Sequence, residues 1–169
     1  DPEVVPANLI LAPGFRDTTV TNKIIQTAER RKDVLALIDL QNDYLPPAER
    51  LAGATDETML GSVGEAISSL KSRNINSSYA ATFYPWVQIS DNLNGGQLLW
   101  IPPSVAALGA FGRSQAQSEL WFAPAGFNRG GLGSLGGSRG PTVIQARQRL
   151  DSRERDALYE VNINPIATF

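Results

Sequence analysis

The sequence predicts an α/β fold: a mostly parallel sheet flanked by helices, with an added β-hairpin and a glycine-rich loop. Residues 34–38 (VLALI) are apolar on both faces of a strand, which is typical of a central parallel strand covered by helices. Strand-like and helix-like segments alternate over the first 84 residues in the order βαβαβ. This order implies right-handed crossovers, which place the strands in one parallel sheet.

The first helix and two further strands follow from local patterns. Residues 8–12 and 78–84 are short apolar segments bounded by turn formers, which is typical of strands. Residues 17–32 carry an apolar side chain every four positions and three basic residues at the end, so they predict a helix. We expect Asp17 or Thr19 to cap this helix.

A second helix is expected between the strands at 34–38 and 78–84. Thr55 or Asp56 can cap its start, and the apolar periodicity runs to about Arg73. Asn74 is a suitable C-terminal stop. The expected buried face consists of Leu60, Val63, Ile67 and Leu70.

The second half of the chain changes character. Residues 86–89 and 97–101 flank a turn-rich segment at 91–96, which predicts a hairpin. Residues 102–104 (PPS) open a helix, since proline is pre-set for a first helical turn. The remaining expectations are a flexible glycine-rich loop at 126–141, a strand at 142–145, a short helix that Asp151 and Glu154 cap, and a closing strand at 162–166.

Composition excludes several classes of chemistry. The 169 residues contain no His and no Cys, so Ser-His-Asp and Cys-His catalysis, Cys/His zinc sites and disulfides are all excluded. The net charge of −2 disfavours electrostatically driven binding of nucleic acid. No apolar run is long enough to predict a membrane span. We expect one domain over residues 1–169, as a fragment of a longer chain.

One local motif suggests an enzyme. Residues 37–44 (LIDLQNDY) resemble the first motif of the isochorismatase-like cysteine hydrolases, in which an Asp at a strand end activates a Cys. The chain has no Cys, and no other side chain here offers comparable nucleophilicity near neutral pH without an activating base. The alternative function is therefore an inactive fold of that type, and Asp39, Asn42 and Asp43 are expected to hold turns.

Other candidate sites carry weaker signals. Asp39, Asp43 and Glu49 could offer oxygen ligands to Mg²⁺ or Ca²⁺, but their spacing matches no defined loop. The glycine-rich segment lacks the Gly-Lys-Ser/Thr of a phosphate loop. Three aromatic clusters leave open a module that binds nucleic acid or carbohydrate, although cores and protein interfaces are commoner uses of tryptophan. These clusters are centred on Trp86, Trp100 and Trp121.

Four motifs of the second half follow one another in a distinctive order. They are residues 80–87 (AATFYPWV), 100–104 (WIPPS), 121–130 (WFAPAGFNRG), and the pair 154–158 (ERDAL) and 162–166 (NINPI). In this order they resemble the contractile-tail sheath family of bacteriophages and related injection machines. The resemblance covers about residues 78–169, and the first half resembles the family only in its α/β pattern.

This resemblance implies a structural function without catalysis, cofactor or metal. It implies stacked hexameric rings of subunits around a tail tube, in which a baseplate triggers contraction and terminal arms join neighbours. The expected location is the virion tail sheath, after synthesis in the host cytoplasm. The arms and outer domains are expected to be missing here, so this fragment is expected to be monomeric. The expected intersubunit residues are Arg113, Arg129 and Arg139, because they lie in a polar, glycine-rich context with few acids.

Overall fold

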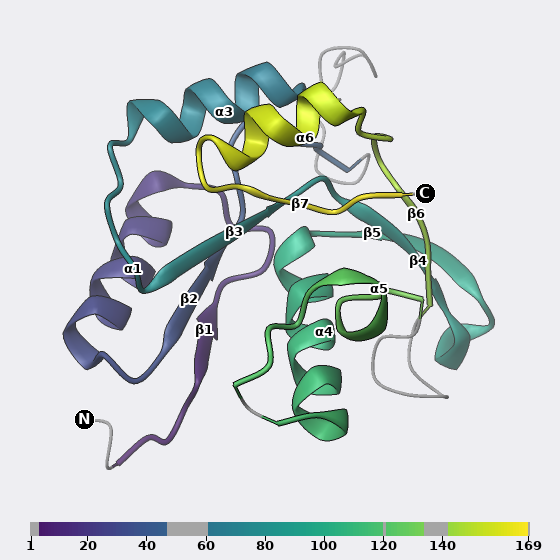
Figure 1. Ribbon diagram of the computed structural model, residues 1–169, viewed down its shortest axis with the longest axis horizontal. Helices are drawn as coiled ribbons and strands as arrows, with labels where there is room; N and C mark the ends of the chain where they lie inside the picture. Colours follow the sequence, from purple (N-terminus) through teal and green to yellow (C-terminus); the bar gives the residue numbers. More distant parts are fainter. Residues whose placement is uncertain (1–3, 47–60, 120, 134–141, 169) are drawn as a thin grey trace.

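The computed structural model describes residues 4–46, 61–119, 121–133 and 142–168 (Figure 1). The strands are β1 (Leu9–Leu11), β2 (Leu35–Ile38), β3 (Ala80–Tyr84), β4 (Val87–Asp91), β5 (Gln97–Ile101), β6 (Thr142–Ala146) and β7 (Asn164–Pro165). The helices are α1 (Thr18–Arg31), α3 (Val63–Ser72), the 3₁₀ turn η2 (Asn92–Asn94), α4 (Pro103–Gln117), α5 (Gly126–Arg129) and α6 (Ser152–Tyr159).

A four-stranded parallel sheet forms the larger half of the molecule. Its order is β1-β2-β3-β7, and every neighbouring pair runs parallel. The central strand β2 has three of its four residues buried, as its uniformly apolar sequence predicts. The predicted βαβαβ arrangement and the α/β class are confirmed.

Helices cover both faces of the parallel sheet. Ile25 and Ala28 of α1 pack with Ile38 of β2, whereas Phe83 of β3 meets Phe111 of α4 with ring centroids 6.1 Å apart. Ile38 is in register with Thr82, so Phe83 points to the opposite face. Helices α3 and α6 lie side by side on the α1 face and share a core with Tyr84 (Figure 1).

Two of the helix caps are the residues that the sequence predicts, and one is a different residue. Asp17 caps α1 and Asp151 forms the predicted capping box with Glu154 at α6. Helix α3, however, begins at Val63 with Ser62 as its cap, so the prediction of one helix from Thr55 or Asp56 is wrong. The hydroxyl of Ser62 accepts a hydrogen bond from the Glu65 backbone, which ends the helix there. Residues 47–60 lie outside the described ranges.

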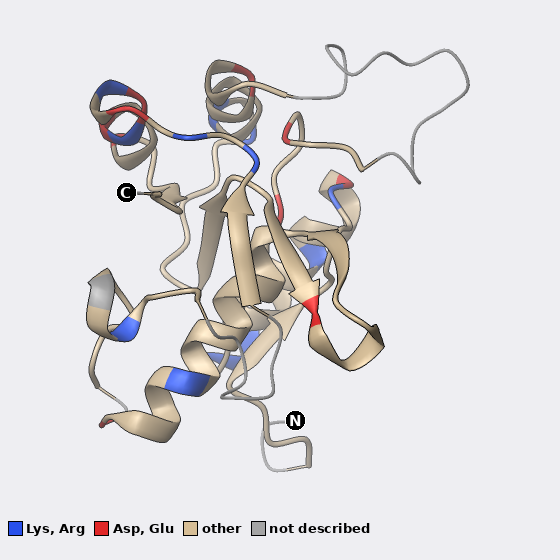
Figure 2. Cartoon of the chain, turned by 90° about the vertical axis from the view of Figure 1, so that its right-hand side faces the viewer, with Lys and Arg blue, Asp and Glu red and all other residues tan. Residues whose placement is uncertain are grey.

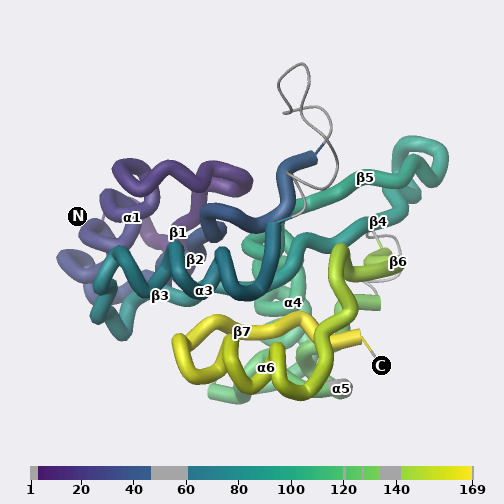
Figure 3. The backbone as a smooth tube through the Cα atoms, turned by 90° about the horizontal axis from the view of Figure 1, so that it is seen from above, coloured from purple at the N-terminus to yellow at the C-terminus, as the bar shows by residue number. Residues whose placement is uncertain are grey.

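A three-stranded antiparallel sheet forms the smaller half. Its order is β5-β4-β6, and the predicted hairpin is the β4–β5 pair. Strand β6, which the sequence predicted without a partner, pairs with the other side of β4 through an irregularity at Gln88 and Ile89. The hairpin projects away from the helices of the parallel sheet (Figure 3). Both β5 and β6 are therefore edge strands.

The predicted flexible loop at 126–141 needs one correction. Its first residues form the short helix α5, which packs on α4. Gly126 begins this turn with φ +71°, a conformation that favours glycine. Residues 134–141 lie outside the described ranges. Among the described residues, no helix is both long and apolar enough to cross a membrane.

A hydrogen-bonded chain ties the C-terminal helix to the parallel sheet. The hydroxyl of Tyr84, at the end of β3, donates to Oε1 of Gln148 at 2.8 Å. The Gln148 amide in turn donates to Oε1 of Glu154 in α6. Burial raises the pKa of the Tyr84 hydroxyl, so it remains a proton donor over the whole physiological range.

We expect Tyr84→Phe to lower the free energy of unfolding by about 1 kcal/mol, because Gln148 loses its buried donor. Urea unfolding followed by circular dichroism measures the change. Tyr79→Phe is the matched control, since Tyr79 is half-buried and its hydroxyl makes no hydrogen bond within the described part of the chain. Equal losses in both variants would show that the hydrogen bond contributes nothing specific.

Candidate functional site

Asp39 lies immediately after β2, at the edge of the sheet where the candidate enzyme motif was predicted. Its side chain is 1 % exposed and accepts three hydrogen bonds. The donors are the backbone of Gly14 (2.9 Å), the backbone of Ser104 (3.1 Å) and the Ser104 hydroxyl (2.8 Å). Asp39 therefore joins the β1–α1 loop to the first turn of α4.

This carboxylate acts as the cap of a distant helix. The residue at the N-cap of α4 is Pro102, which supplies no side-chain hydrogen bond. The first backbone N–H groups of a helix need acceptors, and a negative charge there is favoured by the helix dipole. Burial raises the pKa of Asp39, although the Gly14 and Ser104 donors and the charge of Arg16 oppose that rise.

Asp43 is the second buried carboxylate of the same loop. It is 4 % exposed, and its Oδ1 accepts the backbone N–H of Tyr44 at 2.7 Å. Its Oδ2 is buried without a hydrogen-bond partner. The backbone of Gly61 packs so closely on the backbone of Asp43 that an added Cβ would lie 2.9 Å from the Asp43 Cα. Burial, with the nearby charge of Asp39, raises the pKa of Asp43 to about 7.

The hydrogen bonds around these carboxylates tie neighbouring segments of the fold together. The hydroxyl of Ser104, which donates to Asp39, is on a residue that is 1 % exposed and out of reach of a substrate. Within the described residues, no group of three Asp or Glu side chains could hold a metal ion. Glu49, the third predicted ligand, lies outside the described residues. The prediction that Asp39 and Asp43 hold turns agrees with this geometry, while Ser104 and Gly14 were not foreseen as their partners.

Two of the three predicted aromatic clusters come together in the fold. Tyr44, which follows β2, contacts Trp86 at 5.8 Å and Trp100 at 5.2 Å between ring centroids. The guanidinium of Arg147 lies over the Tyr44 ring at 4.9 Å and near the Trp100 ring at 5.8 Å. Tyr44 and Trp86 are almost fully buried, so their faces are not available to a sugar or a base.

Trp121, the third cluster, lies apart and is 77 % exposed. It stacks on Phe122, whose ring is covered from another side by the guanidinium of Arg129 at 4.4 Å. Arg113, on α4, donates a hydrogen bond to the carbonyl oxygen of Gly131. The two predicted interface arginines in the described ranges thus also hold the segment after α4 in place. Arg139 lies outside the described ranges.

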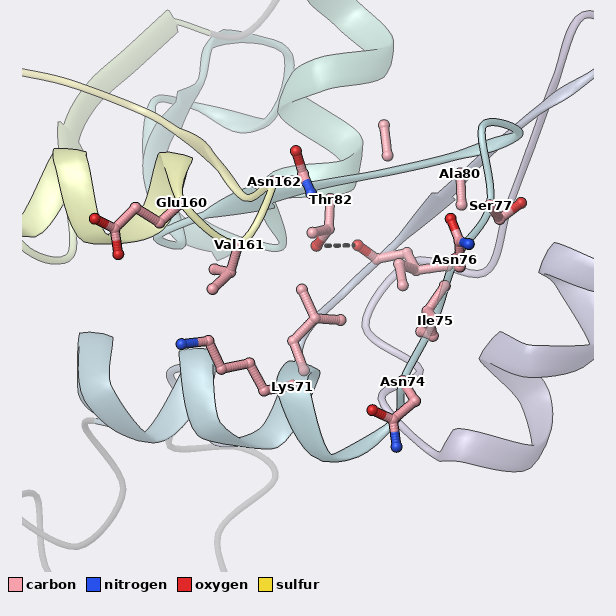
Figure 4. A pocket seen from close by; sticks show the side chains of 13 residues that line it. Lys71, Asn74, Ile75, Asn76, Ser77, Ala80, Thr82, Glu160, Val161 and Asn162 are labelled. Carbon is pink, nitrogen blue, oxygen red and sulfur yellow. Dashed lines mark hydrogen bonds between the residues drawn. The ribbon is translucent and has the colours of Figure 1, made fainter.

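A hollow with a volume of about 390 Å³ lies between α3, the turn after α6 and the start of β3 (Figure 4). Lys71 and Glu160 lie at its border, and amide side chains such as Asn76 and Asn162 line it. The hydroxyl of Thr82 donates to the carbonyl of Ile38 at its floor. None of its lining side chains is one of the buried carboxylates, and no acid–base pair or nucleophile–base pair is found there.

The antiparallel sheet presents a surface suited to protein contacts. The fifteen residues of β4, β5 and β6 include one charged side chain, Asp91, and Figure 2 shows their ribbon almost free of charge. Leu98 and Leu99 on the edge strand β5 are 58 % and 44 % exposed. In the described part of the chain, no strand pairs with the outer side of β5. Apolar edge strands of this kind are sites of strand addition.

Fold and site together define a class: an α/β domain with hydrogen-bonded internal ties and weakly charged strand edges. Comparison with known proteins shows what the chain is similar to. The chain is 27 % identical to the tail sheath protein of Enterobacteria phage T4 over 88 % of its length, and 24 % identical to the tail sheath protein of Vibrio phage KVP40 over 100 %. The chain is thus similar to the tail sheath proteins of two phages, and the isochorismatase-like alternative is not favoured.

A solved structure shows the same fold. The contracted helical sheath of the anti-feeding prophage, determined by electron cryomicroscopy, covers 99 % of this chain with a TM-score of 0.57 at 22 % identity. No family model matches the sequence. The chain spans 21 % and 25 % of the two curated relatives, and 37 % of the solved sheath chain.

Proposed function

We propose that the chain is the core of a structural subunit of a contractile phage tail sheath. In this proposal the subunit polymerises around the tail tube and contracts to drive the tube through the host envelope, without catalysis. The observation that carries it is the similarity to two phage tail sheath proteins along nearly the whole chain. The fold shared with a contracted helical sheath supports it.

The physical character of the domain fits this function. A sheath subunit has to move as a body while its contacts with neighbours change. Buried ties such as the Asp39 bonds and the Tyr84 chain stiffen the core, since fully satisfied buried polar groups fix one arrangement. The exposed edge of β5 offers backbone groups to a strand from another subunit. Heterologous contacts of this kind generate open helical arrays.

The finer features of the proposal concern partners and place. Its partners are other copies in stacked hexameric rings, a tail tube and a baseplate, and its location is the virion tail after synthesis in the host cytoplasm. We also propose that the described core belongs to a longer subunit whose arms and outer domains join neighbours. The chain by itself is then monomeric.

Electron microscopy of the full-length gene product that contains this sequence tests the proposal. We expect striated tubes under conditions that favour assembly, and a monomer in light scattering of the 169-residue chain alone. A full-length product that stays monomeric at every concentration and ionic strength tried would contradict the sheath function. Spontaneous tubes from the 169-residue chain would contradict only the proposal that its joining parts are missing.

Arg113, Arg129 and Arg139 remain the proposed intersubunit residues. Replacing all three by Glu in the full-length product is expected to reduce tube formation at least tenfold, because each changes a cation into an anion at a polar contact. Sedimentation of tubes measures the loss, and thermal melting checks that the subunit folds. If the Glu variant does not fold, the corresponding triple Gln variant replaces it.

The matched control changes three exposed arginines elsewhere by the same charge: Arg30, Arg149 and Arg153. We expect this control to assemble normally. Equal loss of tubes in both triple variants would mean that overall charge, rather than these positions, governs assembly. Normal tubes from the first variant would remove the three residues from the interface.

A further inference from the structure

Four side chains from four separated segments meet where the parallel and antiparallel sheets join. Tyr44 follows β2, Trp86 precedes β4, Trp100 lies in β5 and Arg147 follows β6. The Arg147 guanidinium covers the Tyr44 ring and approaches the Trp100 ring, while Tyr44 also contacts Trp86 edge to face. We name these four residues the inter-sheet cluster. It connects every strand of the antiparallel sheet to the end of β2.

Hydrogen bonds to backbone carbonyl oxygens hold three members of the inter-sheet cluster, Tyr44, Trp86 and Arg147. The Arg147 N–H donates to the carbonyl of Trp86 at 2.7 Å, which joins the end of β6 to the start of β4. Arg16, from the β1–α1 loop, donates to the carbonyl of Tyr44 at 3.2 Å. Tyr44 is 3 % and Trp86 2 % exposed. The Tyr44 ring is therefore held by the parallel half, and Arg147 is held by the antiparallel half.

The two faces of the antiparallel sheet are covered differently. Val87 and Ile89 point to the core with α4. Trp100 pairs with Gln88 in register and so points to the other face, away from this core. On that face the inter-sheet cluster is the aromatic contact with the parallel half. Removing it would leave the sheet supported from the α4 side and by the chain connection at β3–β4.

We infer that Arg147 is a positioning residue: its guanidinium, which lies over the Tyr44 ring and near the Trp100 ring that Tyr44 contacts, fixes the angle of the antiparallel sheet. It thereby sets the direction in which the β5 edge meets a second copy of the chain. The last step rests on the proposed function, whereas the first concerns this chain alone. The planar guanidinium can lie flat against one ring while its edge reaches another. Its Nε is buried without a hydrogen-bond partner, so ring contacts rather than a hydrogen bond hold that part of the side chain.

Hydrogen exchange of the 169-residue chain tests the first step. In Arg147→Gln we expect the amides of β5 and β6 to exchange at least tenfold faster, while those of β1 and β2 change less than threefold. Arg147→Lys keeps a cation beside the rings, so we expect it to restore a large part of the protection. Arg149→Gln, two residues away and exposed, is the matched control and should leave every strand unchanged.

Two results would overturn this step. Unchanged protection of β5 and β6 in Arg147→Gln would show that Arg147 does not hold the antiparallel sheet. An equal loss of protection in both sheets would show a general destabilisation instead of positioning. Tryptophan emission gives a second readout, since a loosened Trp100 is expected to shift to longer wavelength.

Tube formation by the full-length product tests the second step. We expect Arg147→Gln to raise the subunit concentration needed for tubes at least fivefold, Arg147→Lys to have a smaller effect, and Arg149→Gln to have none. Normal assembly by an Arg147→Gln subunit with a loosened β5 would refute the link between sheet angle and assembly. Absence of tubes from the unmodified product contradicts the proposed function itself, and the hydrogen-exchange result on the isolated chain stays independent of it.

Discussion

Replacing Asp39 with alanine is expected to lower the free energy of unfolding by about 4 kcal/mol. The side chain is buried and accepts hydrogen bonds from Gly14 and from both the backbone and hydroxyl of Ser104. Alanine leaves these three donors without their acceptor in the protein interior. It also removes the negative charge at the start of α4, whose own cap residue, Pro102, makes no side-chain hydrogen bond.

Asp39→Asn is expected to cost about half as much. The amide keeps one acceptor oxygen, which can still accept from some of the three donors. Its nitrogen cannot accept a hydrogen bond, so a backbone N–H of Ser104 or of Gly14 that faces the nitrogen loses its acceptor. The Ser104 hydroxyl can rotate and accept from that nitrogen, so one bond is regained. If the alanine variant does not fold, this isostere supplies the measurement by chemical denaturation.

Two control variants separate the cap from a general effect of removing a carboxylate. Ser104→Ala removes only the hydroxyl donor, so we expect a loss of about 1 kcal/mol. Asp17→Asn keeps a good cap residue at the exposed start of α1, so we expect little change. If Asp39→Ala costs no more than Ser104→Ala, the backbone donors of Gly14 and Ser104 do not depend on Asp39.

Elements that depend on neighbours in sequence could be predicted from the sequence. The cap at Asp17 and the capping box at Asp151 join atoms within three residues of each other, and both were recognised. The uniformly apolar β2 predicted a covered parallel strand. The start of α3 was misplaced because several residues before it can serve as caps, and only the geometry near Gly61 and Ser62 selects the last of them.

Contacts between distant segments could not be predicted in the same way. Asp39 and Ser104 are 65 residues apart, and nothing in either local pattern shows that β2 ends beside the first turn of α4. A signal existed in the Pro-Pro-Ser start of α4, because a helix with proline at its cap position needs an acceptor from elsewhere. Strand β6 was recognised as a strand, but its pairing with β4 depends on the β3–β4 corner rather than on its own residues.

The proposed interface residues also show why partners distant in sequence are not predicted. The sequence indicates Arg113 and Arg129 because few acids lie near them in sequence. In the structure Arg113 bonds to the Gly131 carbonyl and Arg129 covers Phe122, so their partners are a backbone oxygen and an aromatic ring. Counting acids misses both kinds of partner. Arg147 is not among the predicted interface residues, and its aromatic partners, Tyr44 and Trp100, come from two other segments.

The stability of the chain is expected to fall as the pH rises from 5 to 8, and Asp43 is the cause. Its pKa is raised to about 7 in the folded protein, whereas an unperturbed Asp has a pKa of 3.8. Between these values the folded state binds more protons than the unfolded state, so stability decreases with increasing pH. We expect this group to account for about 2 kcal/mol over that interval.

The groups around Asp43 explain the direction of the shift. Burial disfavours the charged form, and the negative charge of Asp39 adds to this effect. The Tyr44 backbone donor and the positive charge of Arg16 oppose it, but Oδ2 has no partner to stabilise an anion. An ionised Asp43 would therefore be a buried charge that is only partly compensated.

Asp43→Asn isolates this contribution, because the amide is nearly isosteric and does not titrate. We expect the free energy of unfolding of Asp43→Asn, minus that of the unmodified chain, to grow by about 2 kcal/mol from pH 5 to pH 8.

Asp33→Asn is the control with the opposite pH dependence. The ion pair with Arg31 lowers the pKa of Asp33, so its contribution is present above pH 4 and is lost as the pH falls further. A difference for Asp43→Asn that stays constant between pH 5 and pH 8 would mean that Asp43 is ionised in the folded chain throughout, and that a partner for Oδ2 forms in solution.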